Sequence, residues 1–157
     1  MRVLFIGSIG LITRDPSEGR RFFVRALGLP LKRSRGAHFL HTERLAGSKY
    51  FGVWPLSEAA KACFGKESWP PDRPVPQVFI EFEVDRPQSV ASAATQLESQ
   101  GYALLHAPRT DPWGQTVARL QTEDGAIIGV SYVPWMHRPA KSKPRKRATS
   151  PRTRRSR

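Results

Sequence analysis

Apolar residues in the first part of the chain follow a pattern that predicts one strand, one helix and three further strands. Residues 3–13 are rich in Val, Ile, Leu and Phe, which predicts a strand covered on both faces. Asp15 and Glu18 are spaced as a capping box, and Gly28 is placed to end the helix that they open. The predicted apolar stripe of this helix is formed by Phe22, Phe23, Ala26 and Leu27. Short strands are predicted at 29–33, 37–42 and 49–54.

The second part of the chain repeats this order. Residues 77–84 alternate apolar and acidic side chains, which predicts a strand, and Asp85 is expected to cap a helix over 87–100. The core face of this helix is predicted to carry Val90, Ala93, Ala94 and Leu97, and Gly101 to end it. Strands are predicted at 102–106, 115–121 and 126–132, the last two joined by an Asp124-Gly125 hairpin turn. The sequence therefore predicts an α+β fold of two βαβββ modules.

The remaining segments set the domain boundaries. We expect one domain over residues 1–137, with module one at 1–56, a linker at 57–76 and module two at 77–137. The linker begins as a short amphipathic helix opened by Ser57 and continues as a proline-rich extended stretch. Residues 138–157 combine prolines, serines and basic residues, a composition typical of a disordered tail.

The net charge of +13 lies mostly in that tail. Ten of the 26 Lys and Arg residues fall within 138–157, which has no acidic residue, so 16 bases face 13 acids in the rest and its net charge is +3. The tail would bind polyanions without sequence preference, which leaves nonspecific nucleic-acid binding open as an alternative role. The single cysteine, Cys63, excludes an intramolecular disulfide, and no apolar run is long enough to cross a bilayer. These features predict a cytoplasmic protein without membrane contact.

Four segments in combination resemble the vicinal oxygen chelate superfamily of glyoxalases, extradiol dioxygenases and bleomycin-resistance proteins. They are IGLITRDPSEGRRFFVRALGLPL, FEVD, PWGQTVARLQTEDGAIIGV and SKYFGVWPLSEAAKACFG, the last of which looks like a bacterial glyoxalase-like subgroup. The resemblance covers residues 2–134 and leaves out the tail. It implies eight strands curled into one cup, and a homodimer, since the cups of this superfamily are often completed across two chains.

The resemblance also indicates where metal ligands would stand. In metal-dependent members, His, Gln or Glu ligands lie on the first and last strands of each module. The matching positions here are Ser8, Phe79 and Gly129, and the fourth lies within Tyr50–Gly52, where no residue is a good ligand. We therefore predict no metal and no cofactor, unless a shift of two residues brings Glu81 into the cup.

The candidate ligand-binding residues are mainly aromatic. A cup without a metal but with aromatic walls suits a flat, partly apolar molecule held by stacking. Trp113 is the strongest candidate because it lies in a loop between Pro112 and Gly114, where a packed core has little need of a tryptophan. The full predicted set is Trp113, Trp54, Tyr50, Phe79, Glu81, His38 and Arg35.

Two groups of polar residues leave alternatives open. Glu81 and Glu83 share one strand face, which is either a solvated edge or, since Phe79 has the same parity, the concave face. His38 and His41 lie three apart in a strand, so they point to opposite faces. His106 is expected at the surface, and His137, which opens the tail, is expected to have no site role.

Three functional hypotheses follow. The first is a metal-free protein of the glyoxalase/bleomycin-resistance type that binds an aromatic or amphiphilic compound in the cup. The second is a divalent-metal lyase, isomerase or dioxygenase of the same superfamily. The third is a nucleic-acid-associated protein that acts through its basic tail. No catalytic residue is assigned, and whether the protein is an enzyme is left open.

Overall fold

The computed structural model describes residues 1–138, which form one curved sheet with three α-helices. Module one contains β1 (Phe5–Thr13), α1 (Pro16–Arg20), a π-helical turn η1 (Arg21–Ala26), β2 (Lys32–Arg33), β3 (Leu40–Thr42) and β4 (Tyr50–Pro55). Helix α2 (Leu56–Phe64) begins the linker. Module two contains β5 (Val78–Glu83), α3 (Pro87–Ser99), β6 (Leu104–Thr110), β7 (Thr116–Gln121), β8 (Ile127–Tyr132) and a closing 3₁₀ turn η2 (Pro134–His137). The two predicted βαβββ modules are confirmed, and the tail beyond residue 138 lies outside the described residues.

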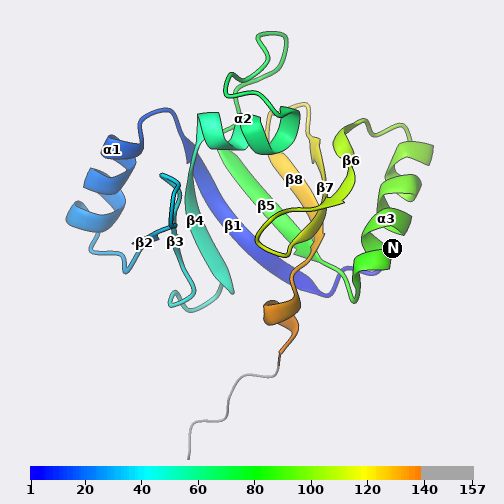
Figure 1. The fold of residues 1–157 in the computed structure, drawn as a ribbon, viewed down its shortest axis with the longest axis horizontal. Coiled ribbons are helices and arrows are strands. Elements are labelled where there is room, and N and C mark those ends of the chain that lie inside the picture. The colour runs from blue at the N-terminus through cyan, green and yellow to red at the C-terminus, as the bar shows by residue number, and fades with distance from the viewer. Residues whose placement is uncertain (139–157) are drawn as a thin grey trace, which may run out of the picture.

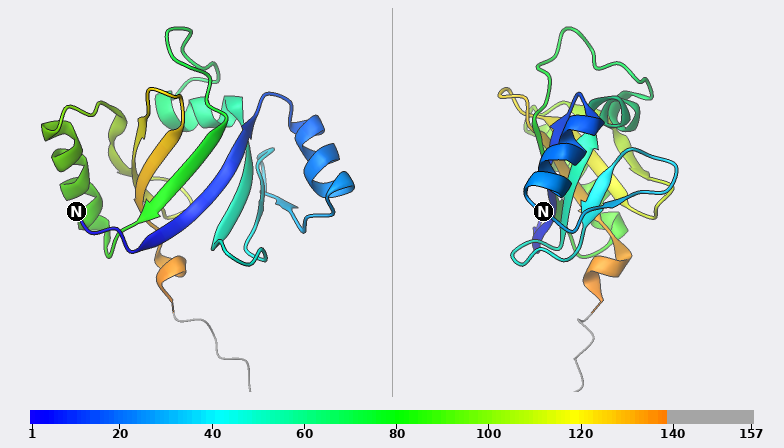
Figure 2. Two further views of the ribbon diagram at one scale, coloured as in Figure 1. Left: turned by 180° about the vertical axis from the view of Figure 1, so that it is seen from behind. Right: turned by 90° about the vertical axis from the view of Figure 1, so that its left-hand side faces the viewer.

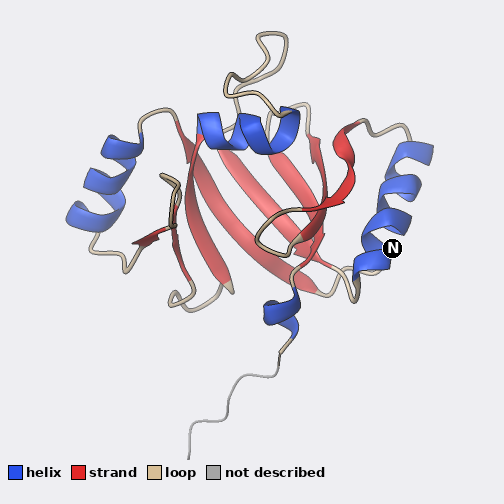
Figure 3. Cartoon of the chain, in the orientation of Figure 1, coloured by secondary structure: helices blue, strands red, loops and turns tan. Residues whose placement is uncertain are grey.

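The eight strands form a single mixed sheet in the order β2-β3-β4-β1-β5-β8-β7-β6 (Figures 1 and 3). The modules meet where β1 pairs antiparallel with β5, and within each module the first strand pairs parallel with the last. Both halves of the cup therefore come from one chain, so no second copy is needed to close the sheet.

The three α-helices lie on different faces of the sheet. Helix α1 packs against β4 and α3 against β6, β7 and β8, so the two helices flank opposite ends of the convex face (Figure 2). Helix α2 packs on the concave side, where Ala59 and Cys63 join a core with Phe79 and Ile127. The α3 core contains Val90, Ala93 and Ala94 as predicted, with Leu97 partly buried against it.

The middle of the convex face carries no helix. Seen from behind, β1 and β5 run across the molecule with nothing in front of them (Figure 2). Ile6 is 48% exposed and Leu11 39% exposed on this face. No helix among residues 1–138 has the length and apolar character needed to span a membrane.

Several helix-end predictions are wrong in detail. Asp15 does cap α1 by accepting from the backbone N–H groups of Ser17 and Glu18, but the Glu18 carboxylate pairs with Arg21 instead of completing a capping box. The carboxylate of Asp85 accepts a hydrogen bond from the Ser89 hydroxyl and caps no backbone group of α3. Both side chains are exposed and bond instead to a side chain three or four residues further along the chain.

Two further helix predictions also fail. Helix α2 begins one residue before Ser57 and has no side-chain cap at its start. The predicted stripe of the first helix is largely solvent-exposed, since Phe22 is 50% and Leu27 53% exposed. The chain changes from α-helix to a π-helical turn at Arg21, which alters the 3.6-residue spacing on which the stripe was predicted.

Two glycines allow β1 and β4 to lie under the aromatic rings of the cup. Gly10 pairs with Gly52, and a Cβ at Gly10 would collide with the carbonyl oxygen of Gly52 and lie 2.5 Å from Cε1 of Phe79. A Cβ at Gly52 would lie 2.5 Å from Cζ of Phe39. Side chains at these positions would therefore occupy the space of both phenylalanines.

The substitution Gly10→Ala is expected to lower the free energy of unfolding by about 3 kcal/mol, because backbone atoms of β4 cannot move away within the sheet. Urea unfolding followed by circular dichroism measures this. Gly19→Ala is the control, since its nearest neighbour is a Val53 methyl group at 3.2 Å that can shift. An equal loss in both variants would contradict the close approach of β1 to β4.

Candidate functional site

The concave face of the sheet holds a cavity of about 570 Å³ that opens to solvent on one side. It lies between the inner surface of the central strands and α2, and the η2 turn forms part of its floor. Its lining combines aromatic rings with about as many polar or charged side chains and a few aliphatic ones: Ser8, Ser34, Arg35, Ala37, Phe39, His41, Glu43, Tyr50, Trp54, Glu58, Phe79, Glu81, Trp113, Gln115, Val133, Trp135 and Met136.

One wall of the cavity consists of three nearly parallel rings from β4 and the β3 region. The rings of Phe39, His41 and Tyr50 have interplanar angles of 12–23° and centroids 5.1–6.1 Å apart. In a column of three stacked rings, the outer two would lie about twice as far apart as neighbouring rings. The three centroid distances here are similar, so the rings are arranged as a triangle. Trp135 stands next to Tyr50, with its ring centroid 6.1 Å away. This wall is therefore a surface on which a flat molecule can stack.

The floor of the cavity contains a buried ion pair. Arg119 of β7 is 1% exposed, and its Nη2 lies 3.1 Å from Oε1 of Glu81 on β5. Its Nη1 lies 3.3 Å from Oδ2 of Asp111, which also pairs with Arg109 at 3.2 Å. The guanidinium of Arg119 further lies 5.5 Å from the ring centroid of Trp54, within cation–π range.

Neutral side chains complete the hydrogen bonding of Glu81. Its Oε2 accepts from the Ser8 hydroxyl at 2.9 Å and from Nε2 of Gln115 at 2.8 Å. The Oε1 of Gln115 in turn accepts from the indole N–H of Trp113 at 2.9 Å. The network thus orients Trp113, although this side chain is 60% exposed at the mouth of the cavity. Each oxygen of the Glu81 carboxylate thus accepts two hydrogen bonds from protein donors.

Gly129 makes room for this network. It pairs with Glu81 on one side and with Arg119 on the other, and a Cβ there would lie 2.8 Å from Cγ of Glu81. A longer acidic side chain at this position would displace the ion pair.

The position predicted on β5 is shifted by two residues: Glu81, not Phe79, lies in register with Ser8 on β1 and Gly129 on β8. The residues present still do not fit a divalent ion. Ser8 donates its hydroxyl to Glu81, Phe79 is a buried ring, and Gly129 has no side chain. Among residues 1–138 no three His, Cys, Asp or Glu side chains are grouped as ligands. The Glu81 carboxylate that does point inward already faces a cation, the guanidinium of Arg119.

A second buried carboxylate, that of Glu83, holds the η2 turn next to the cavity. Glu83 is fully buried and accepts hydrogen bonds from the Ser131 hydroxyl, the backbone N–H of Val133 (2.8 Å) and Nε2 of His137 (2.8 Å). The His137 ring stacks on Tyr132 with centroids 4.6 Å apart. These contacts hold η2 against the sheet, so His137 has a structural role that the sequence did not indicate.

Burial and neighbouring charges shift the pKa of three groups around the cavity. Burial lowers the pKa of His41 below its ordinary value, against an opposing effect of Glu43, so the ring is neutral at pH 7. Burial and the nearby Glu43 raise the pKa of Tyr50, which keeps its phenol protonated. Burial would lower the pKa of Arg119, but the carboxylates of Glu81 and Asp111 raise it above its ordinary value.

Most of the residues predicted to bind ligand lie on this cavity. Six of the seven line it, namely Arg35, Tyr50, Trp54, Phe79, Glu81 and Trp113. His38 does not: it points away, near the Arg33 guanidinium, and His41 takes the inward position. Glu81 and Glu83 are 6% and 0% exposed, so the concave alternative is correct and the solvated-edge alternative is wrong. The binding role of these residues remains a prediction.

Several residues of the site were not predicted from the sequence. Arg119 lies in the apolar stretch TVARL, and a lone charge in a central strand is itself a sign of a buried partner. Trp135 and Met136 were missed because they follow the last predicted strand, yet the chain turns back and places them under the cavity.

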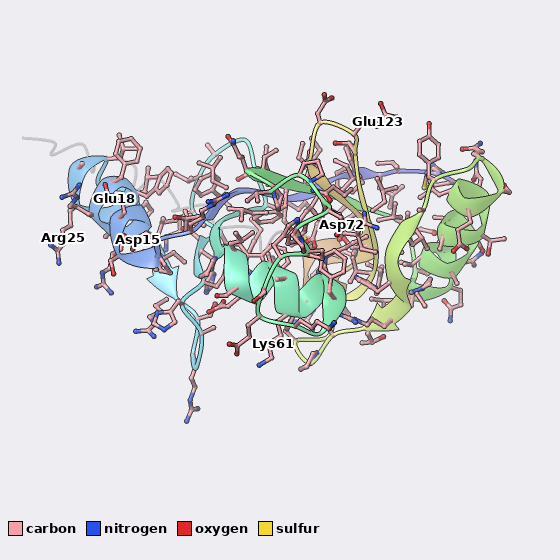
Figure 4. All side chains as sticks on the ribbon, turned by 90° about the horizontal axis from the view of Figure 1, so that it is seen from above. Asp15, Glu18, Arg25, Lys61, Asp72 and Glu123 are labelled. Carbon is pink, nitrogen blue, oxygen red and sulfur yellow. The ribbon has the colours of Figure 1, made fainter. Side chains whose placement is uncertain are left out.

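A second hollow lies at the far end of the molecule and is polar. It is lined by side chains around α1 that include Asp15, Glu18 and Arg25, labelled in Figure 4. The Glu18–Arg21 pair within it is exposed to solvent. The aromatic cavity is therefore the better candidate site.

A continuous eight-stranded cup made of two βαβββ modules defines the class of protein. Residues 5–130 match the model of the Glyoxalase/Bleomycin resistance protein/Dioxygenase superfamily, and the chain belongs to this superfamily. A comparison with curated proteins finds no match.

Solved structures with this fold are distant in sequence. A glyoxalase/bleomycin resistance protein/dioxygenase superfamily member from Vibrio splendidus 12B01 shares 18% identity over 83% of this chain and 99% of its own, with a TM-score of 0.53. A variant of Streptomyces coelicolor methylmalonyl-CoA epimerase in complex with 2-nitronate-propionyl-CoA shares 16% identity over 88% of this chain and 100% of its own, with a TM-score of 0.56. At this identity the similarity concerns the fold alone.

Replacing Arg119 tests the buried network. Arg119→Met is expected to reduce the free energy of unfolding by about 3–5 kcal/mol, because it leaves the Glu81 and Asp111 carboxylates buried without their cation. Urea unfolding measures the loss. Arg109→Met is the matched control, with an expected loss of under about 1 kcal/mol, because this arginine is 41% exposed. If Arg119→Met were no worse than the control, the network would contribute little to stability.

The Cys63 thiol is expected to be inert in the folded protein. It is 1% exposed, and burial raises its pKa to about 11. Since only the thiolate reacts, labelling by a disulfide reagent at pH 8 should be at least about a hundredfold slower in buffer than in denaturing urea. Complete and rapid labelling without denaturant would show that α2 separates readily from the sheet.

Proposed function

We propose that this protein binds a planar aromatic or amphiphilic small molecule in the cup, without a divalent ion at the superfamily's ligand positions. The observation that carries the proposal is the aromatic cavity with the Arg119–Glu81 ion pair at its floor. A volume of about 570 Å³ lies in the range of small-molecule sites.

Two partly exposed tryptophans on the cavity lining support a binding role. Trp113 is 60% exposed and Trp135 is 37% exposed, although both line the cavity. Folding gains little from an indole left in water, whereas a flat ligand between such rings buries them. Trp69, in contrast, packs on Phe64 and donates its N–H to Pro74, away from the cavity.

The enzyme alternative has less support from the residues of this chain. A metal-dependent lyase, isomerase or dioxygenase needs converging donors. At these positions only Glu81 is a strong donor, and its carboxylate is paired with Arg119. The epimerase of similar fold binds 2-nitronate-propionyl-CoA. It shares only 16% sequence identity with this chain, which gives no reason to assign CoA substrates here.

Two other predictions continue as proposals. A homodimer is favoured by the uncovered apolar surface around Ile6 and Leu11 on the convex face. Nonspecific nucleic-acid binding rests on the charge of the tail alone, since the rest of the chain has a net charge of only +3.

Tryptophan fluorescence provides the test of small-molecule binding. In titrations of the full chain with planar compounds of one to three fused rings, we expect saturable quenching by at least one compound class. Trp113→Leu should weaken its binding about tenfold, because a stacking surface is lost. Trp69→Phe is the control and should leave the affinity unchanged. If no compound quenches, or if both variants behave alike, the proposed binding site is wrong.

A further inference from the structure

Around the cavity, negative side chains outnumber positive ones when the residues that form ion pairs with one another are left out of the count. Arg119 and Arg109 compensate Glu81 and Asp111, so this network carries no net charge. The other charged residues on the lining are Glu43, Glu58 and Arg35. No ion pair within residues 1–138 involves these three side chains, which leaves two carboxylates against one guanidinium.

The negative charges stand beside the aromatic wall. Glu43 follows the β3 strand that carries His41, and its field acts on the side chains of both His41 and Tyr50. Glu58 lies on α2, where its carboxylate accepts the backbone N–H of His38 and so faces the β3 region. Arg35 is exposed on the turn before this region.

His41 adds no positive charge to this wall. Its ring is neutral at pH 7, because burial lowers its pKa below the ordinary value. Lys32 also acts on this ring, in opposition to Glu43, but it does not line the cavity.

We propose that the ligand of the cup is a planar aromatic cation, held between the aromatic wall and the carboxylates of Glu43 and Glu58. This inference rests on the proposed function and names its ligand class. Aromatic faces attract cations, most strongly where water is excluded, and carboxylates at the rim strengthen the attraction. The chain as a whole is strongly basic, so a negative cavity is not a consequence of composition.

The test compares three ligands of similar shape and different charge. The probes are 1-methylquinolinium as the cation, 2-methylquinoline as the neutral ring at pH 8, and 1-naphthoate as the anion. Tryptophan fluorescence of the full chain at 150 mM salt gives each dissociation constant. The cation is expected to bind about tenfold more tightly than the neutral ring, and the anion more weakly than both.

Two sets of variants locate the preference. The double variant Glu43→Gln with Glu58→Gln should remove most of the cation's advantage and leave the neutral ring's affinity within about twofold, since glutamine keeps an acceptor oxygen for His38. Glu98→Gln, on the exposed side of α3, is the control with the same change of residue type. Circular dichroism shows that all variants are folded.

The outcomes distinguish a failure of the cation inference from a failure of the proposed binding function. If the neutral ring or the anion binds as tightly as the cation, or if the double variant keeps the preference, the cation inference is wrong and the aromatic binding site stands. Tighter binding of the anion would assign the selectivity to Arg35 instead. If none of the three probes binds and the wider panel of planar compounds is also silent, the proposed function fails as well.

Discussion

The buried ion pair between Arg119 and Glu81 is the interaction on which the floor of the cup depends. Each charge would be strongly unfavourable alone in this interior, so the two residues are stable only together. Their contact requires Gly129 between them, Ser8 and Gln115 to complete the carboxylate's hydrogen bonds, and Asp111 to share the guanidinium. Through Gln115 it also orients Trp113 at the cavity mouth. One pair thereby links the strands β5 and β7 to a loop at the mouth of the cavity.

This pair lies where the resemblance to the superfamily places the ligands of metal-dependent members. A glycine at 129 and a serine at 8 are consistent with a floor in which the positive charge is part of the protein. The guanidinium is covalently held and cannot exchange ligands, so it neutralises Glu81 but leaves no coordination site for a substrate oxygen.

The walls follow from close approach of backbones. Gly10 and Gly52 leave room above β1 and β4 for Phe79 and Phe39, and the rings of His41 and Tyr50 continue that surface. The closing turn η2 adds Trp135 and Met136 from the end of the described chain, held there by the hydrogen bonds of Glu83. The cavity thus depends on both modules and on the segment that follows them.

The sequence by itself determined the order of the elements, the two modules, the turn glycines and four of the aromatic residues that line the candidate site. These depend on local spacing: alternation in strands, helix ends at Gly28 and Gly101, and the Asp124-Gly125 turn. Tertiary structure decided which face was concave. It placed His41 instead of His38 in the cavity, buried Glu81 and Glu83, and brought Arg119 to Glu81 from 38 residues away. Local patterns cannot show such pairings, because the parity of a strand gives two faces but not the neighbours that each face meets.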